Sequence, residues 1–277
     1  AHGGLNSEGY SAETANRLWS FANKKNLRAY FFIWESGVDE SILGWLKSDD
    51  DASGPAGFSL QDAWESIKKG TGAIVREALK KLGAGLAPVA RQAFWDEMKG
   101  RSQGASTPKG GAALFADQLF QAMSLRPEDR YKIHLVAHSA GSIYLAWLYQ
   151  NVLRSKFNGK VQLGSIQFMA PAITITKAKQ IFSTVPKDRF QIYMLKPEDE
   201  ENDSIYIYPS SLLTYVRDYL ESKDGPIPIL GIRKDFNGAS INFATPVLAE
   251  VSVRHGEFDD RGHEIETILT EIAEGNL

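Results

Sequence analysis

The chain has 277 residues, of which 43% are hydrophobic and 11% aromatic, and its formal net charge is −3. This length and apolar content suffice for one large core, and the charge gives no basic footprint of the kind that nucleic-acid-binding domains carry. The absence of cysteine excludes disulfides, thiolate metal sites and a cysteine nucleophile, although it does not decide the cellular compartment. No stretch approaches the roughly 20 apolar residues of a membrane span, and the first residues do not resemble a signal peptide.

Two elements are predicted near the start of the chain. Residues 11–26 place apolar side chains at helical spacing, which predicts an amphipathic helix. The segment from Leu27 to Trp34 is apolar almost throughout and rich in aromatic residues. Such a run is typical of a strand that is covered on both faces of a sheet.

The next segment, residues 59–111, is predicted to be a helical insertion with a linker at its end. Apolar residues at helical spacing are interleaved with lysine and arginine between Trp64 and Leu82, and a second apolar face runs from Leu86 to Met98. Residues 100–111 are rich in Gly and Ser, which indicates a linker, and residues 112–123 again have a helical pattern. We interpret 59–111 as a cap within a single domain of residues 1–277. The alternative is that these helices simply cover the sheet.

The centre of the chain joins a short apolar strand to an apolar helix. Ile133 to Ala137 form the strand, and residues 140–153 form a helix that is apolar on nearly every side. The junction reads Ala137-His138-Ser139-Ala140-Gly141. A strand that turns at once into a helix holds the central serine in a strained conformation. Positions two before and two after it must then be small, as Ala137 and Gly141 are.

Further strands and helices alternate after this junction. Strands are predicted at 161–169, 189–195 and 248–254, and a closing helix at 264–273. This alternation favours an α/β fold, in which a mostly parallel sheet carries helices on both faces.

The junction resembles the G-x-S-x-G turn of the α/β-hydrolase superfamily, with Ala137 in place of the first glycine. The resemblance implies that Ser139 is the nucleophile and that the N–H of Ala140 lies in the oxyanion hole. In this superfamily a glycine-rich loop after the third strand supplies the second oxyanion N–H. The opening Ala-His-Gly-Gly resembles that loop, which implies the N–H of Gly4 or Leu5, although the strand that should precede the loop is missing from the sequence.

The superfamily order of serine, acid and histidine implies a base near the end of the chain. His255 follows the last predicted strand and is our candidate base, with His263 at the start of the closing helix as the alternative. His134 lies inside a strand and is expected to be a core or interface residue. We expect the side chain of His138 to point away from Ser139, because neighbours on a turn diverge. His2 belongs to the opening loop.

The acid is expected in the loop after the strand at 189–195, which contains many carboxylates. Asp203 is our choice, because Ile205 follows it as an aliphatic anchor in the way the superfamily pattern has it. Glu198 and Asp199 remain alternatives. Most carboxylates in such a run are solvated surface charges, and the alternating spacing of a calcium-binding loop is absent.

Together these features predict a serine hydrolase that cleaves an ester of a small-molecule or lipid-like acyl substrate through Ser139, His255 and Asp203, without a cofactor or metal. Trp64 and Phe94 in the cap are expected to bind the acyl chain. Two alternatives stay open. One is a peptidase, amidase or thioesterase with the same triad, and the other is a non-catalytic α/β-hydrolase domain that binds a ligand or a protein partner.

Overall fold

The computed structural model describes residue 1 and residues 8–33, 95–126, 128–203 and 210–277. Within these residues the chain forms a sheet of four parallel strands in the order β1-β2-β3-β4. The strands are β1 (Tyr131–His138), β2 (Val161–Met169), β3 (Phe190–Met194) and β4 (Thr245–Leu248). The predictions of β1, β2 and β3 are confirmed, and so is the α/β class of the fold.

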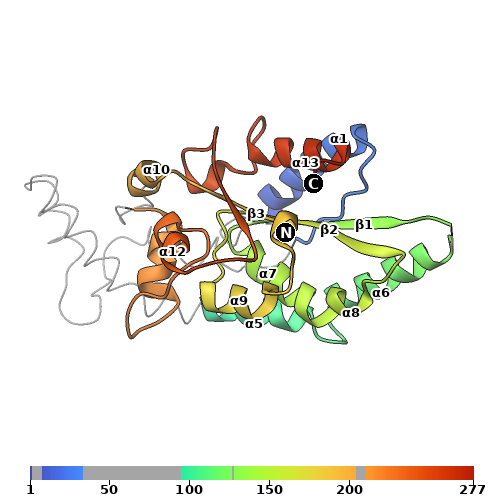
Figure 1. Ribbon diagram of the computed structural model, residues 1–277, viewed down its shortest axis with the longest axis horizontal. Coiled ribbons are helices and arrows are strands. Elements are labelled where there is room, and N and C mark those ends of the chain that lie inside the picture. The colour runs from blue at the N-terminus through green and yellow to red at the C-terminus, as the bar shows by residue number, and fades with distance from the viewer. Residues whose placement is uncertain (2–7, 34–94, 127, 204–209) are drawn as a thin grey trace, which may run out of the picture.

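Helices cover both faces of this sheet (Figure 1). One face carries α1 (Glu8–Lys24) and α13 (Glu264–Glu274), which pack against each other. The other face carries α5 (Asp96–Ala105), α6 (Gly111–Ser124), α7 (Gly141–Leu148), α8 (Arg154–Lys156) and α9 (Ile175–Phe182). A π-helical turn, Tyr149–Leu153, continues α7 into α8. Among the described helices, none is long and apolar enough to cross a membrane.

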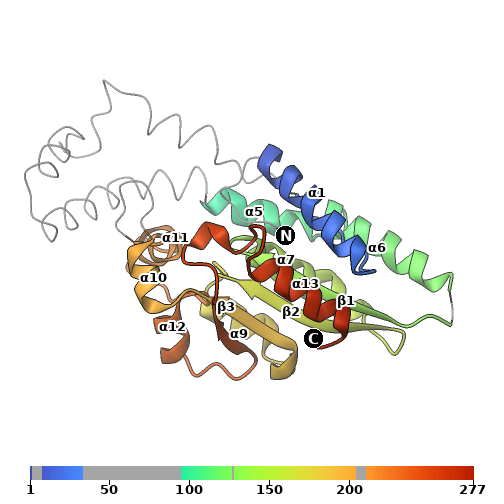
Figure 2. The same cartoon turned by 90° about the horizontal axis from the view of Figure 1, so that it is seen from above.

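Three short helices gather near the carboxyl ends of the strands (Figure 2). They are α10 (Pro197–Asn202), α11 (Leu212–Tyr215) and α12 (Arg233–Gly238). A π-helical turn at Val216–Leu220 follows α11, and single 3-10 turns lie at Lys187–Arg189 and His255–Glu257. Because an open parallel sheet binds its ligands at the carboxyl ends of its strands, this end of the molecule is where a site is expected.

The core between β2, β3 and α9 is built from phenylalanine rings. Phe168 of β2 lies edge to face with Phe182 at 5.7 Å and with Phe190 at 5.1 Å between ring centroids. Phe243 extends the cluster, at 5.8 Å from Phe190. All four rings are at most 2% exposed. Edge-to-face packing adds to the hydrophobic gain of burying such rings, so this cluster holds α9 to the sheet.

The register of the pairing between β1 and β2 shifts beside His134. Ile133 aligns with Leu163, but Leu135 aligns with Ile166, so β2 carries an extra residue. A Cβ on Gly164 would come within 2.4 Å of the His134 ring, and His134 Nδ1 lies 2.8 Å from Ser165 Oγ. Partial burial lowers the pKa of His134 to about 4. His134 therefore packs against β2, as expected of a core residue.

The predicted strand at 27–34 does not form within its described part, residues 27–33. Tyr30 is 51% exposed and Ile33 is 44% exposed, whereas Phe32 packs against Phe115 and Tyr144. A run in which Tyr30, Phe31 and Ile33 are all exposed is not covered on both faces, so its apolar composition was misleading here.

The predicted linker at 100–111 begins instead as the second half of α5. Ser102 is fully buried, and its hydroxyl donates to the Met98 carbonyl at 2.9 Å. A small serine that bonds to the preceding turn lets a helix pack closely, which composition alone does not reveal. The remainder of the predicted cap, residues 59–94, lies outside the described residues.

The last strand was predicted at 248–254, but β4 ends at Leu248. The Glu264 carboxylate accepts hydrogen bonds from the backbone N–H groups of Glu250, Val251 and Ser252 at 2.9–3.2 Å. These N–H groups are therefore not available to a strand ladder, and the chain turns away from the sheet before His255.

We expect Phe168→Ala to lower the free energy of unfolding by about 3–5 kcal/mol, because it opens a cavity among three buried rings. Urea denaturation measures this loss. Leu125→Ala is the control, since Leu125 is 78% exposed and its truncation should change stability by no more than ~0.5 kcal/mol. Similar losses in both variants would contradict this description of the core.

Candidate active site at the Ser139 turn

Ser139 lies at the turn between β1 and α7 and has a left-handed backbone with φ of 52°. Its N–H donates to the Met169 carbonyl of β2 at 2.9 Å, and its carbonyl accepts from the N–H of Ala172 at 3.1 Å. The Ser142 hydroxyl also donates to the Ser139 carbonyl, at 2.7 Å. A non-glycine residue rarely adopts such a φ, and these bonds hold it there.

His255 reaches this serine from the other end of the chain. Its Nε2 lies 2.8 Å from Ser139 Oγ, and both residues are buried, at 7% and 3% exposure. His255 sits in the 3-10 turn that follows the loop bonded to Glu264. The structure thus brings together the two residues that the sequence suggested as nucleophile and base. The hydroxyl can pass its proton directly to this ring nitrogen.

Asp203 also reaches His255, but at the main chain rather than at the imidazole. Its Oδ2 accepts a hydrogen bond from the His255 backbone N–H at 2.7 Å. The ring Nδ1 of His255 is buried and has no hydrogen-bond partner in the part of the chain that the structure describes. Burial raises the pKa of Asp203, although the His255 N–H opposes this. The expected contact between the Asp203 carboxylate and the imidazole is therefore not made.

The alternative residues lie elsewhere. Glu198 is exposed and Asp199 half-buried on α10, and their carbonyls accept bonds from Asn202 and Asp203. His263 precedes α13, and its Nδ1 lies 3.1 Å from Ser252 Oγ. His263 thus contacts the loop before His255 rather than Ser139.

His138 belongs to this site, contrary to expectation. Its ring centroid lies 5.1 Å from that of His255, and its Nε2 is 2.7 Å from the His255 carbonyl oxygen. Its Nδ1 is 3.6 Å from Oδ1 of Asp259, a carboxylate that is only 5% exposed. Neighbours on a turn do diverge, but the His255 loop folds back over the strand end and meets the His138 ring there.

Asp259 escaped the sequence analysis because its loop also holds Glu257 and Asp260. The distinguishing signal was Phe258, which is fully buried and draws its neighbour inward. Asp203 was chosen because an aliphatic residue, Ile205, follows it within two positions, and no aliphatic residue follows Asp259 in this way.

The charges of the three buried groups are coupled. Burial, reinforced by His138, lowers the pKa of His255 to about 3. Burial also opposes protonation of His138, but the Asp259 carboxylate outweighs it and the pKa of His138 is raised. Burial likewise opposes ionisation of Asp259, yet its pKa is lowered because His138 and Arg17 favour the anion. Burial and the neighbouring His138 thus favour the neutral form of His255, whereas the raised pKa of His138 and the lowered pKa of Asp259 favour the charged forms of that pair.

The residues predicted to form an oxyanion hole are described only in part. Ala140 is 2% exposed, and its N–H donates to no acceptor within the described residues. Ala1 donates to the Val136 carbonyl at 2.8 Å and accepts from the His138 N–H at 3.1 Å, the bonding pattern of a parallel strand beside β1. Gly4 and Leu5 lie outside the described residues, and so do the predicted substrate contacts Trp64 and Phe94.

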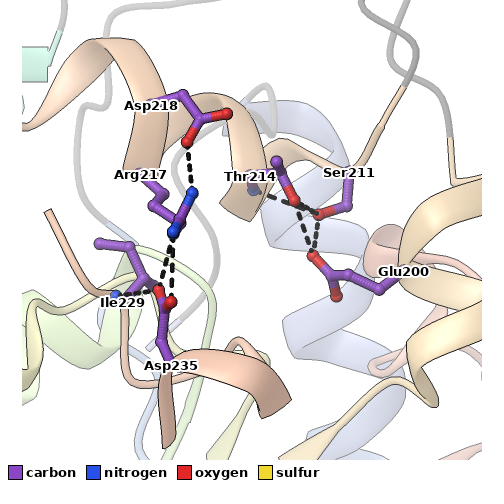
Figure 3. A network of polar contacts seen from close by, with 7 residues as sticks. All are labelled: Glu200, Ser211, Thr214, Arg217, Asp218, Ile229 and Asp235. Atoms are coloured by element: carbon purple, nitrogen blue, oxygen red, sulfur yellow. Dashed lines mark hydrogen bonds and ion pairs between the residues drawn. The ribbon is translucent and has the colours of Figure 1, made fainter. Parts of the chain in front are cut away.

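A half-buried carboxylate, that of Glu200, lies in the helix that leads to Asp203 (Figure 3). Glu200 of α10 accepts hydrogen bonds from the hydroxyls of Ser211 and Thr214, which tie α10 to α11. Burial raises the pKa of Glu200 to about 7, although the Ser211 hydroxyl opposes this and Asp203 adds to it. This contact fixes the short helix that ends at Asp203.

Beside it, Arg217 lies between two carboxylates (Figure 3). Its Nε donates to both oxygens of Asp235 at 3.1 Å, and its Nη1 donates to Asp218 at 2.7 Å. Asp235 also accepts the Ile229 N–H at 2.9 Å. This network secures the segment between α11 and α12. No cluster of three His, Asp or Glu side chains among the described residues fits a metal ion.

No family model, no curated protein and no solved structure matches this chain. The geometry of the site must therefore carry the functional argument alone.

We expect Glu200→Gln to change stability in a pH-dependent way. Between pH 4.5 and about 7 the folded protein keeps the Glu200 proton while the unfolded chain loses it, so this group weakens folding as the pH rises. Glutamine cannot ionise. The free energy of unfolding of the variant relative to wild type should therefore increase from pH 5 to pH 8, by roughly 1–3 kcal/mol.

Urea denaturation at the two pH values measures this change. Glu198→Gln is the matched control, because Glu198 is exposed on the same helix, and its difference from wild type should stay constant. A constant difference for Glu200→Gln as well would contradict the assignment of a buried, protonated carboxyl.

Proposed function

We propose that the protein is a serine hydrolase of the α/β-hydrolase type that cleaves a carboxylic ester. The observation that carries the proposal is the 2.8 Å contact between Ser139 Oγ and His255 Nε2 at a strained strand–helix turn. The strain is the second support, because a left-handed serine whose N–H and carbonyl are both held by hydrogen bonds needs a reason to persist.

The proposed reaction begins with His255 as the neutral base. His255 Nε2 takes the Ser139 proton as Oγ attacks the acyl carbonyl, and the carbonyl oxygen becomes an oxyanion. The N–H of Ala140 donates to that oxygen, together with an N–H of Gly4 or Leu5 by resemblance. His255 then gives the proton to the leaving alcohol. Water then attacks the acyl carbonyl while His255 takes a proton from it. His255 returns that proton to Ser139 Oγ as the bond to the acyl carbon breaks, and the carboxylic acid is released.

The substrate is proposed to be a small-molecule ester or lipid-like compound with an apolar acyl chain. This rests on the apolar residues of the predicted cap, Trp64 and Phe94 among them. The same nucleophile and base also suit a peptidase, an amidase or a thioesterase. Assays with ester, amide and thioester substrates distinguish these activities.

A second candidate function is a non-catalytic domain that binds a ligand at this site. The observation that favours it is the buried His255 Nδ1, which no carboxylate contacts among the described residues. In a working triad an acid at this atom holds the tautomer and stabilises the imidazolium. Reaction with an acyl-site probe separates the two candidates.

We expect a fluorophosphonate probe to label the purified protein, because it phosphonylates a serine that a base activates. Ser139→Ala should abolish the labelling while circular dichroism shows an intact fold. Ser155→Ala is the control, since Ser155 is an exposed residue of α8. Absence of labelling in wild type would favour the binding domain, and labelling of Ser139→Ala would place the nucleophile elsewhere.

We expect His255→Ala to slow hydrolysis of a medium-chain p-nitrophenyl ester by about 10²–10⁴-fold, because the serine loses its base. His263→Ala should retain most of the activity, since His263 contacts Ser252 instead. Steady-state kinetics of the two variants measure this difference. The reverse order of the two rates would identify His263 as the base.

A further inference from the structure

His138 lies between two groups that can only accept hydrogen bonds. Its Nε2 lies 2.7 Å from the His255 carbonyl oxygen, and its Nδ1 lies 3.6 Å from the Asp259 carboxylate. The Nδ1 contact has the length of an ion pair and not of a hydrogen bond, and this buried atom has no hydrogen-bond partner among the described residues. A neutral imidazole carries one N–H and leaves a lone pair on the other nitrogen. Only the imidazolium presents a proton to both partners, so the geometry favours a cationic His138 paired with an anionic Asp259.

The surroundings hold this pair in place. Phe258 is fully buried, its ring lies 6.0 Å from that of His138, and its carbonyl accepts the N–H of Ile265 at 3.1 Å. Arg17 of α1 donates to the Asp259 carbonyl and pairs with Glu266 at 3.0 Å. The titratable and charged groups that act on the pair are His255, Asp260, Arg17 and the Ala1 amine.

The main chain of His255 is thereby held on both sides. Asp203 accepts its N–H at 2.7 Å, and His138 faces its carbonyl oxygen at 2.7 Å. With the N–H and the carbonyl of this residue both bonded, the imidazole has few ways to leave Ser139. Its orientation is set although no acid contacts Nδ1 within the described residues.

We propose that His138 and Asp259 are positioning residues for His255, in which a cationic His138, held by Asp259, fixes the His255 carbonyl and keeps the neighbouring imidazole unprotonated. This inference rests on the proposed function and assigns to the hydrolase two groups that act through His255. A cation next to His255 disfavours a second proton on its ring, so the base stays competent in mildly acidic solution.

The charge of His138 is tested first, without reference to activity. Nitrogen-15 NMR of histidine-labelled protein at pH 7 should show one imidazole with both ring nitrogens protonated. This imidazolium signal should be missing in His138→Gln. In Asp259→Asn it should be replaced by the signals of a neutral imidazole. Asp260→Asn removes the same charge one residue later and should leave the imidazolium in place. A neutral His138 in wild type overturns the inference.

The kinetic test separates the effect of the hydrogen bond from His138 to the His255 carbonyl from the effect of the positive charge on His138. Glutamine at 138 can still donate to the His255 carbonyl but carries no charge, whereas leucine can do neither. His138→Leu should lower kcat for the p-nitrophenyl ester by about 10²-fold with little change in KM, as expected for a misplaced base. His138→Gln should keep more of kcat but move the acid limb of the kcat/KM profile upward, toward the ordinary histidine value of about 6.5.

Each outcome decides the question. A wild-type rate and acid limb in both His138 variants overturns the inference, even when Ser139 reacts with the probe. If wild type does not react with the probe, the proposed function fails, and the NMR experiment alone judges the His138–Asp259 pair. If His138→Leu does not fold, Asp259→Asn takes its place, and it should lower kcat whereas Asp260→Asn should not.

Discussion

The left-handed conformation of Ser139 is the constraint on which the site depends. With φ of 52°, the backbone turns from β1 into α7 within two residues, and the side chain projects from the carboxyl end of the strand. The strain is offset by bonds to the neighbouring strand β2 and to the segment after it, through Met169 and Ala172. The conformation of the site therefore depends on the parallel pairing of β1 and β2 as well as on the serine itself. A slip in their register would release the turn.

This dependence explains why the centre of the chain was predictable. Small residues at 137 and 141 and an apolar strand before the serine are local requirements of the turn, so they appear in the sequence. β2 and β3 were also predictable, because each segment is rich in aliphatic and aromatic residues, which favour strands. The strand predicted at 27–34 had such a run as well, but exposure of Tyr30 and Ile33 shows that tertiary context decided against it. The composition of an apolar segment does not show whether that segment pairs with a strand of the sheet.

The polar groups around His255 were less predictable, for a different reason. Carboxylates are common in loops, and what selects one is burial by distant residues. Glu264 ends β4 early by accepting three backbone N–H groups, Asp203 binds a main-chain N–H, and Asp259 pairs with a histidine more than a hundred residues away. Each bond joins segments that are distant in sequence or lie in irregular loops. Neither periodicity nor a motif contains this information. His255 and Asp203 were therefore chosen from their positions after strands, whereas Asp259 and the main-chain contact of Asp203 were not predicted.

The arrangement around His255 has an electrostatic consequence that a simple triad lacks. In the proposed reaction, the proton of Ser139 makes the His255 ring cationic beside the proposed imidazolium of His138, and like charges at this separation repel. Asp259 offsets part of that repulsion because it is the counter-ion of His138 and favours protonation of His255 as well. Asp203 adds negative charge at the His255 main chain. The transferred proton is therefore held weakly and is passed on readily to a leaving group. A base of this kind takes up a proton less readily than an ordinary histidine does, and it releases the proton more readily.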